Sequence, residues 1–383
     1  MKAVHFGAGS IGRGFIGDLL HESGYDIVFI DIDPDLLAEV NSTGSYDFRL
    51  IEDDYRTRTI DRVRGVSSLE NPLEVIAEIA TADIITTSVW ADNLKHIAPI
   101  LGEGLRERMS RGGARVSVVA CENAMRSSEV LRARILERAD ITADELDAVA
   151  TFPNTAVDRL VLESRDNGRR VLDVGRDHEL VIDRTALVDP QSTPITGAVY
   201  TDDVIPYIER KLYIINCGHA WAGYIGHLQG YTIMQDIFAN DDLREQMRAA
   251  MRESAEVIHH KHKFDPDSLE EYIDFAINRF RIPGVIDIVP RVCRSPIRKL
   301  GTDERFIGPA LQAVAAGTPY GHLARGIAAV FRFDNPDDPQ SVELLAEVSE
   351  RGIAAAVTHR TGQPPQSALH QAIVAAYEQE DAS

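Results

Sequence analysis

The sequence has few cysteines, and they lie far apart. Cys121, Cys217 and Cys293 are the three cysteines among 383 residues, and they form no CxxC pair. A disulfide framework or a zinc finger requires several suitably spaced cysteines, so we expect neither. A reducing compartment, the cytoplasm, is the expected location.

Long apolar runs are also lacking. No uncharged apolar stretch approaches the roughly 20 residues that a membrane-spanning helix needs. The first residues, MKAVHFGAGS, turn to glycine after a short apolar stretch and do not resemble a signal peptide. The sequence therefore predicts no membrane partner.

Basic side chains are in the minority. The chain has 40 Lys and Arg against 60 Asp and Glu, for a net charge of −20. This charge disfavours nucleic acids and anionic membranes as partners. We expect a small-molecule partner instead, bound by a monomer or a small homo-oligomer. An anionic substrate would require a local basic pocket, because the net negative charge of the protein repels it.

Glycine is concentrated near the start of the chain. Residues 3–6 (AVHF) are typical of a buried strand, and the segment Gly7-Ala8-Gly9-Ser10-Ile11-Gly12 follows, ahead of a predicted helix. This is G-x-G-x-x-G between strand and helix. The first glycine allows a tight turn, the second allows close approach of a pyrophosphate, and the third allows close packing. The pattern predicts dinucleotide binding at the helix N-terminus.

Asp31 completes this pattern. It ends the second predicted strand, DIVFI (26–30), nineteen residues after Gly12. A carboxylate there accepts hydrogen bonds from ribose hydroxyls and repels a 2′-phosphate, which favours NAD over NADP. Asp33, just before Pro34, is the better cap for the next helix, so Asp31 is expected to be free for the cofactor.

Strands and helices continue to alternate after this motif. ADIITTSV (82–89) and RVSVVAC (115–121) read as buried parallel strands, DAVATF (147–152) is expected to continue the sheet, and VLDVG and ELVID are expected later strands. Ligands of such sheets bind at the carboxyl ends of the strands. Ser88, Asn93 and Asn123 are therefore expected near the cofactor.

The second half of the chain has a different pattern. DPQSTPITG (189–197) is rich in proline, glycine and small polar residues, and mostly helical segments follow it. We therefore predict an α/β protein with an N-terminal Rossmann-type dinucleotide-binding domain, residues 1–190. A mainly α-helical substrate and catalytic domain, residues 191–383, is expected to follow.

One apolar segment of the second half, KLYIINCGH, contains three residues capable of catalysis. At about 100° per residue, Asn216 lies roughly 140° and His219 roughly 80° from Lys211, so all three occupy one sector of a helix. Each alone is more simply explained by packing. Three together, following a nucleotide-binding fold, indicate an active site.

The spacing K-x-x-x-x-N-x-x-H resembles the signature of the polyol-specific long-chain dehydrogenases, the mannitol dehydrogenase family. KAVHFGAGSIGRGFIG at the start, ACENAMR (120–126), FPNTAVDR (152–159) and RVCRSPIRKL (291–300) are similar to the phosphate-sugar branch of that family. The resemblance implies an NAD-dependent, metal-independent enzyme that interconverts a polyol phosphate and a sugar phosphate.

The resemblance also implies roles for single residues. Lys211 would act as general base, provided that burial and nearby positive charge lower its pKa. Asn216 and Asn123 would hold the substrate oxygen as it gains negative charge. His219 would orient a substrate hydroxyl.

Three residues depart from the usual family pattern. Ser10 stands where asparagine is common, Trp90 where glycine is frequent, and Cys217 where threonine is frequent. Trp90 is the largest change and lies near the expected cofactor edge, so it bears on the identity of the polyol.

The segment RVCRSPIRKL carries four cations in ten residues. Arginine binds phosphate through two parallel hydrogen bonds, so members of this segment are candidates for holding a substrate phosphate. A salt-bridged surface turn is the alternative. The candidate residues are Arg291, Arg294, Arg298 and Lys299.

Two other functions remain open. A free-polyol dehydrogenase or a hexuronate reductase of the same architecture would lack the phosphate site. A non-catalytic NAD-sensing protein would need the glycine motif and Asp31, but would have no use for a converging Lys211, Asn216 and His219.

Overall fold

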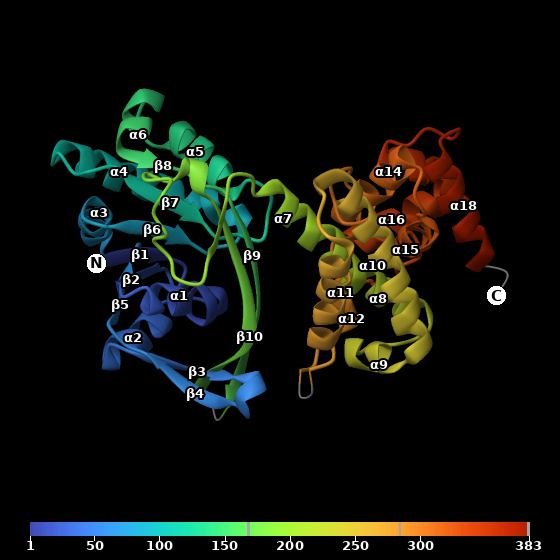
Figure 1. Ribbon diagram of the computed structural model, residues 1–383, viewed down its shortest axis with the longest axis horizontal. Helices are drawn as coiled ribbons and strands as arrows, with labels where there is room; N and C mark the ends of the chain where they lie inside the picture. The colour runs from blue at the N-terminus through green and yellow to red at the C-terminus, as the bar shows by residue number, and fades with distance from the viewer. Residues whose placement is uncertain (167–168, 283–284, 381–383) are drawn as a thin grey trace. The chain divides into compact units, whose positions relative to one another are not determined.

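The computed structural model describes residues 1–166, 169–282 and 285–380. Contacts divide the chain into two compact units, Met1–Ile208 and Glu209–Ser383. We call them the first and the second unit, and Figure 1 shows the sheets of the first and the helices of the second.

A parallel sheet forms the centre of the first unit. Its neighbouring strands are all paired in parallel. The order along the sheet is β5 (Val63–Ser67), β2 (Asp26–Asp31), β1 (Lys2–Phe6), β6 (Ile84–Thr87), β7 (Val116–Ala120) and β8 (Ala150–Thr151). This order reverses direction between β1 and β6, as in the doubly wound nucleotide-binding fold, and ligands of such sheets bind at that reversal.

Both faces of this sheet are buried, because successive side chains of a strand point to opposite faces. Val4 and Phe6 of β1 pack on one face with helices α3 to α6. Ala3 of β1 packs on the other face with α1 and α2. The helices of this unit, in chain order, are η1 (Gly12–Ile16), α1 (Gly17–Glu22), α2 (Pro34–Thr43), η2 (Ile51–Asp53), α3 (Pro72–Ala80), η3 (Ala91–Asn93), α4 (Leu94–Ser110), α5 (Ser127–Arg138), α6 (Ala143–Val149), η4 (Arg184–Ala186) and α7 (Ile205–Arg210), of which α7 crosses the division between the units.

The expectation that VLDVG and ELVID are later strands of the same sheet is wrong. Both lie in one strand, β10 (Arg169–Asp183), which forms a long antiparallel pair with β9 (Thr155–Asp166), visible in Figure 1. β10 belongs to a second sheet that also contains β11 (Val199–Thr201), β3 (Tyr46–Leu50) and β4 (Arg56–Ile60). Leu172 and Val174 of β10 pack in the same cluster as α1, so this sheet covers one face of the first.

The predicted strand DAVATF is also largely wrong. Thr142 and Glu145 form a reciprocal capping box that starts α6, and the helix continues through Val149. Leu146 and Val149, three residues apart, are buried on one face of α6. Only Ala150 and Thr151 remain to pair with β7 as β8.

The second unit is helical, as predicted. Trp221 is fully buried near its centre, among apolar side chains from several helices. The helices in chain order are η5 (Lys211–Asn216), α8 (Cys217–Leu228), α9 (Met234–Ala239), α10 (Asp241–His262), α11 (Pro266–Phe280), α12 (Val289–Cys293), α13 (Pro296–Lys299), α14 (Ile307–Ala316), α15 (Gly321–Val330), α16 (Pro339–Arg351), α17 (Ile353–Thr361) and α18 (Ala368–Glu380). Among the described residues, none of the helices combines the length and apolar character required to cross a membrane.

Candidate functional site

The glycine motif links β1 to the helix that begins in the same segment. Gly7 has φ +99°, and a Cβ there would lie 2.5 Å from the Ser88 carbonyl oxygen, so only glycine fits. A Cβ on Gly12 would lie 1.9 Å from the Gly7 carbonyl oxygen. A Cβ on Gly9 would meet nothing within 4 Å. The first and third glycines are required by the fold, whereas the second faces open space that a ligand can enter.

Asp31 ends β2 beside this motif, but it is not free, contrary to expectation. Its Oδ2 accepts a hydrogen bond from the Ala8 amide at 2.6 Å, and its Oδ1 accepts from the Ile32 and Asp33 amides at 2.7 and 3.0 Å. Because β1 and β2 are neighbours, the carboxylate at the end of β2 reaches the glycine loop. Asp31 therefore holds this loop in place. Ribose hydroxyls of a bound cofactor would have to share carboxylate oxygens that already accept hydrogen bonds from backbone amides.

Asp33 caps α2 as predicted, accepting from the Asp35 and Leu36 amides. Its other oxygen pairs with Arg170 at 2.6 Å. Arg13, just after the third glycine, is buried and donates from Nε to the Ala8 carbonyl oxygen at 2.8 Å. The sequence interpretation missed Arg13, although its place in GAGSIGRG is a signal that could have identified it.

Ser88 follows β6, and its hydroxyl is bonded to His5. His5 Nε2 lies 2.8 Å from Ser88 Oγ, and its Nδ1 lies 2.6 Å from Thr86 Oγ1. Burial lowers the pKa of His5 to about 3, so the imidazole is neutral near neutral pH. Neutral His5 therefore positions the hydroxyl of Ser88 beside the glycine motif.

Glu122 holds the loop after β6 from the neighbouring strand β7. Its buried carboxylate accepts from Thr87 Oγ1 at 2.7 Å and from the Val89 amide at 3.0 Å. Asn93 closes the same loop by donating from Nδ2 to the Val89 carbonyl oxygen at 2.8 Å. Ser88 and Asn93 thus lie at the carboxyl end of β6, as expected, and Asn93 supports the loop itself. Asn123 follows Glu122 and is exposed.

In the second unit, Lys211, Asn216 and His219 are half-buried, whereas Tyr213 to Ile215 are fully buried. Lys211–Asn216 is a π-helix, so the α-helical angle assumed for Asn216 does not apply. The i→i+5 pattern of a π-helix places residues five apart about one turn apart. Lys211 and Asn216 are consequently closer to one face than the 140° estimate indicated.

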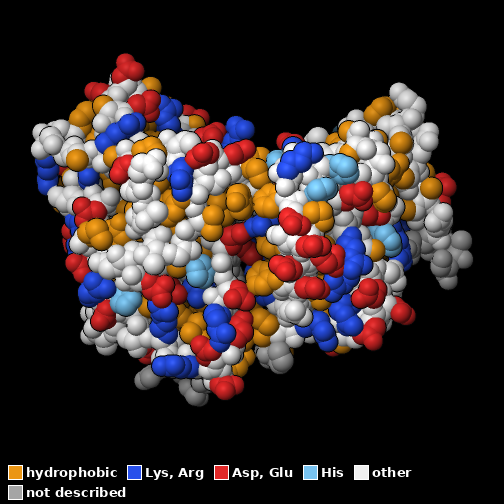
Figure 2. Space-filling model, in the orientation of Figure 1, with side chains coloured by type: hydrophobic (Ala, Val, Ile, Leu, Met, Phe, Trp, Pro, Cys, Tyr) orange, Lys and Arg blue, Asp and Glu red, His pale blue; other side chains and the backbone are white. Residues whose placement is uncertain are grey.

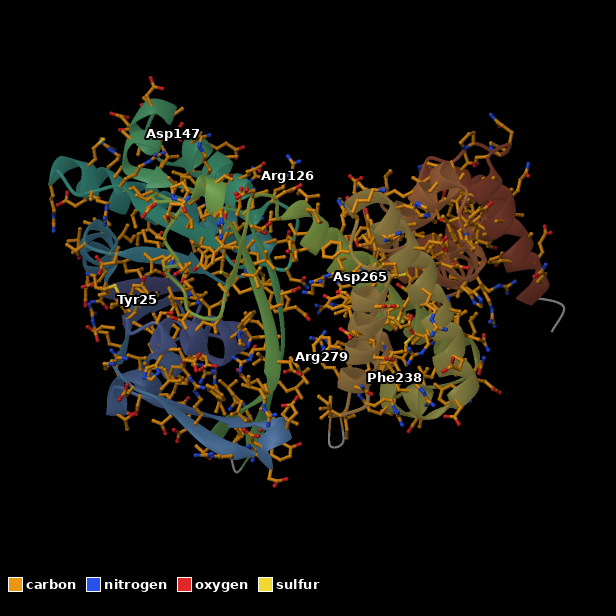
Figure 3. The ribbon with its side chains drawn as sticks, viewed as in Figure 1. Tyr25, Arg126, Asp147, Phe238, Asp265 and Arg279 are labelled. Atoms are coloured by element: carbon orange, nitrogen blue, oxygen red, sulfur yellow. The ribbon has the colours of Figure 1, made fainter. Side chains whose placement is uncertain are left out.

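His219 lies in an aromatic stack. Its ring centroid is 4.7 Å from that of Phe280 and 5.9 Å from that of Phe238, which Figure 3 labels on α9. Its Nε2 is 3.6 Å from Asp287 Oδ2. Burial lowers the pKa of His219 to about 4 even though Asp287 opposes the shift. His219 is therefore neutral near neutral pH.

The basic segment is divided between two short helices. α12 ends at Cys293, Ser295 has φ +57°, and Pro296 begins α13. Arg294 and Arg298 therefore do not share a helix. The left-handed Ser295 and the proline after it interrupt the helix.

The four candidate cations have different surroundings. Arg291 Nε donates to Asp287 at 2.6 Å, and Arg298 pairs with Glu304 at 2.8 Å. Lys299 is 2 % exposed and donates to the Arg294 carbonyl oxygen. Burial, reinforced by Arg305, lowers the pKa of Lys299 to about 7. The Arg294 guanidinium is exposed and has no ion pair within the described ranges, so it is the most available of the four.

Comparison with known proteins resolves the family. A model of the mannitol dehydrogenase Rossmann domain matches residues 1–191, and a model of the mannitol dehydrogenase C-terminal domain matches residues 203–380. The chain belongs to the mannitol dehydrogenase family. Family membership makes it an NAD-dependent polyol oxidoreductase and confirms the predicted fold class, cofactor and resemblance.

Curated relatives match over almost the whole chain. A mannitol-1-phosphate 5-dehydrogenase from Arthrobacter sp. (strain FB24) is 40 % identical over 99 % of this chain and 98 % of its own length. One from Halalkalibacterium halodurans is 38 % identical, covering 98 % of this chain and 99 % of its own. One from Talaromyces marneffei is 36 % identical, with coverages of 97 % and 96 %.

Solved structures share the fold at lower identity. Pseudomonas fluorescens mannitol 2-dehydrogenase, in a ternary complex with NAD and D-mannitol, has a TM-score of 0.73 at 16 % identity, covering 99 % of this chain and 91 % of its own. Substrate-free D-sorbitol dehydrogenase has a TM-score of 0.81 at 16 % identity, with coverages of 99 % and 92 %. The domain limits 1–190 and 191–383 stay a prediction.

Proposed function

We propose that the chain is an NAD-dependent mannitol-1-phosphate 5-dehydrogenase that interconverts D-mannitol 1-phosphate and D-fructose 6-phosphate. The observation that carries this proposal is the similarity to relatives of that name, 35–40 % identical over 93–100 % of this chain. The predicted cytoplasmic location, the absence of nucleic-acid and membrane partners and a monomeric or small homo-oligomeric state remain predictions.

Lys211 is the proposed general base. On oxidation, the substrate hydroxyl would give its proton to Lys211 Nζ while the hydride leaves the same carbon for the nicotinamide ring. This role requires the neutral amine, which is the form that accepts a proton. In the reverse direction Lys211 would protonate the ketone oxygen as NADH delivers the hydride.

Two further residues of this helix support the same chemistry. Asn216, one π-turn after Lys211, is proposed to donate to the oxygen as it gains negative charge. Asn123 stays a predicted second donor. His219 is proposed to orient a substrate hydroxyl, a role suited to an imidazole held neutral by its lowered pKa. Because the ammonium and amide donors supply this stabilisation, the proposed reaction is metal-independent.

The substrate phosphate is proposed to bind the basic segment, with Arg294 as the principal contact. Arg291 and Arg298 each already pair with a carboxylate, and Lys299 is buried with its ammonium on a carbonyl. The visible face in Figure 2 shows acidic and basic side chains interspersed, so a phosphate dianion needs a local group of cations of this kind.

The test is NADH oxidation with fructose 6-phosphate beside unphosphorylated fructose. We expect kcat/KM for fructose to be lower by at least about 10-fold, the loss of one charge-assisted contact. Added sulfate should compete with fructose 6-phosphate and leave NADH binding unchanged.

Arg294→Ala localises this effect, with Arg291→Ala as its matched control in the same segment. The first should raise KM for fructose 6-phosphate at least about 10-fold, and the second should change it less. Equal activity on fructose and fructose 6-phosphate would contradict the phosphate site and leave a free-polyol dehydrogenase or a hexuronate reductase, distinguished by testing a hexuronate.

A further inference from the structure

Trp90 has a backbone conformation that tryptophan rarely adopts. It follows β6 with φ +73° and ψ +138°, in the half of the φ/ψ map that residues other than glycine avoid. Such a conformation costs free energy and persists only where neighbouring contacts impose it.

Neighbouring contacts do impose it. The amide of the preceding residue, Val89, donates to the buried carboxylate of Glu122 at 3.0 Å, and the Trp90 carbonyl oxygen accepts from the Asn93 amide at 2.9 Å. Asn93 also fixes Val89 through its side chain at 2.8 Å. The loop is therefore built to hold Trp90 in this position.

The Trp90 side chain contributes little to the packing of the described residues. Trp90 is 71 % exposed, whereas the other tryptophan, Trp221, is fully buried in the second unit. A large aromatic ring left mostly in water contributes little to stability. Neither backbone preference nor burial explains why a tryptophan occupies this position, so we look for the explanation in ligand binding.

The position of the loop indicates the ligand. Gly7 would place a Cβ 2.5 Å from the Ser88 carbonyl oxygen and 3.2 Å from a methyl of Val89, so the residues before Trp90 lie against the glycine motif. β1 and β6 are also the strands between which the sheet order reverses, where dinucleotides bind.

We propose that Trp90 is a cofactor-binding residue whose indole stacks on an aromatic base of NAD. This inference rests on the proposed use of NAD and adds a specific contact to it. Stacking of a base on an aromatic side chain changes affinity by roughly 5- to 100-fold. The strained loop is thus retained because it presents the indole to the cofactor.

Tryptophan fluorescence tests the contact, because stacking quenches only the indole that touches the base. NAD⁺, ADP-ribose and nicotinamide mononucleotide are added separately to the full chain, and Trp90→Phe provides the emission of Trp221 alone. We expect NAD⁺ to quench the wild-type emission and to leave the emission of Trp90→Phe nearly unchanged. Quenching by ADP-ribose identifies adenine as the partner, and quenching by nicotinamide mononucleotide identifies the nicotinamide.

Trp90→Gly provides the second measurement, with calorimetric titration of NAD⁺ and thermal unfolding. Glycine relieves the strain, so we expect the melting temperature to rise by about 2–4 °C. The same change should weaken NAD⁺ binding by roughly 5- to 100-fold, and Trp90→Phe should recover part of the affinity. Tyr55→Gly is the matched control, because Tyr55 is also a partly exposed aromatic residue with positive φ, +57°.

The outcomes separate this inference from the proposed function. If wild-type protein binds NAD⁺ by calorimetry but Trp90→Phe and Trp90→Gly bind it equally well, the stacking contact is wrong and the cofactor assignment stands. If wild-type protein binds no NAD⁺, the proposed function fails as well. A higher melting temperature of Trp90→Gly with unchanged NAD⁺ affinity also overturns the inference, because it shows that Trp90 is strained but does not contact the cofactor.

Discussion

Lys211 is the single residue on which the proposed chemistry most depends. We expect Lys211→Met, which preserves the length of the side chain, to lower kcat by at least about 100-fold, because it removes the group that accepts the hydroxyl proton. NADH affinity should stay within about twofold, since the candidate cofactor contacts lie in the first unit. Steady-state assays and calorimetry measure the two quantities.

The control for Lys211 is another lysine of the second unit. Lys261, on α10, pairs with Glu209 at 2.7 Å and has no proposed catalytic role. Lys261→Met should retain kcat within about twofold. Near-normal turnover of Lys211→Met would remove the general-base assignment whatever the control shows.

At the scale of the element, two glycines in the turn from β1 into η1 are needed for different reasons. Gly12→Ala would bring a Cβ within 1.9 Å of the Gly7 carbonyl oxygen, so the backbone must shift. We expect it to destabilise the protein by about 1–3 kcal/mol, as overpacking does. Gly9→Ala meets nothing within 4 Å and should change stability by less than about 0.5 kcal/mol.

Cofactor affinity should respond differently to these two substitutions. Gly9→Ala places a methyl group in the open space that the pyrophosphate is proposed to enter, and we expect NAD⁺ binding to weaken at least about 10-fold. Urea unfolding and calorimetry of both variants measure this. Unchanged NAD⁺ affinity of a stable Gly9→Ala variant would show that the phosphates bind elsewhere.

At the scale of the whole molecule, each unit contains a histidine that burial keeps neutral. The pKa falls to about 3 for His5 in the first unit and to about 4 for His219 in the second. The unfolded chain takes up these protons near pH 6.5, whereas the folded chain resists them. Both groups therefore stabilise the fold above pH 6.5, and this stabilisation is lost as the pH falls toward 4.

We expect the free energy of unfolding to fall by up to about 1.4 kcal/mol per pH unit for each histidine between pH 6.5 and 5. His219→Asn should reduce this slope, because one proton uptake is removed, and His260→Asn, at an exposed position of α10, is the control substitution. Urea unfolding at several pH values measures the slope. An identical slope in His219→Asn and wild-type protein would contradict the burial of a neutral imidazole.

The sequence alone determined the features that depend on neighbouring residues. The turn at Gly7, the close packing at Gly12 and the cap at Asp33 follow from steric and hydrogen-bonding rules that act over a few residues, and the structure has all three. The helical second half followed from periodicity in the same way. The spacing of Lys211, Asn216 and His219 indicated the family, although their roles remain proposals.

The tertiary structure decided what depends on residues far apart in the sequence. Asp31 was expected to be free, but its carboxylate reaches the Ala8 amide because β1 and β2 are neighbours in the sheet. β10 has the apolar residue pattern of a buried parallel strand, but it belongs to a second sheet because it pairs with β9 and β3. The bonds of Glu122 to the Thr87 hydroxyl and the Val89 amide likewise join a side chain to groups that only the folded chain brings together.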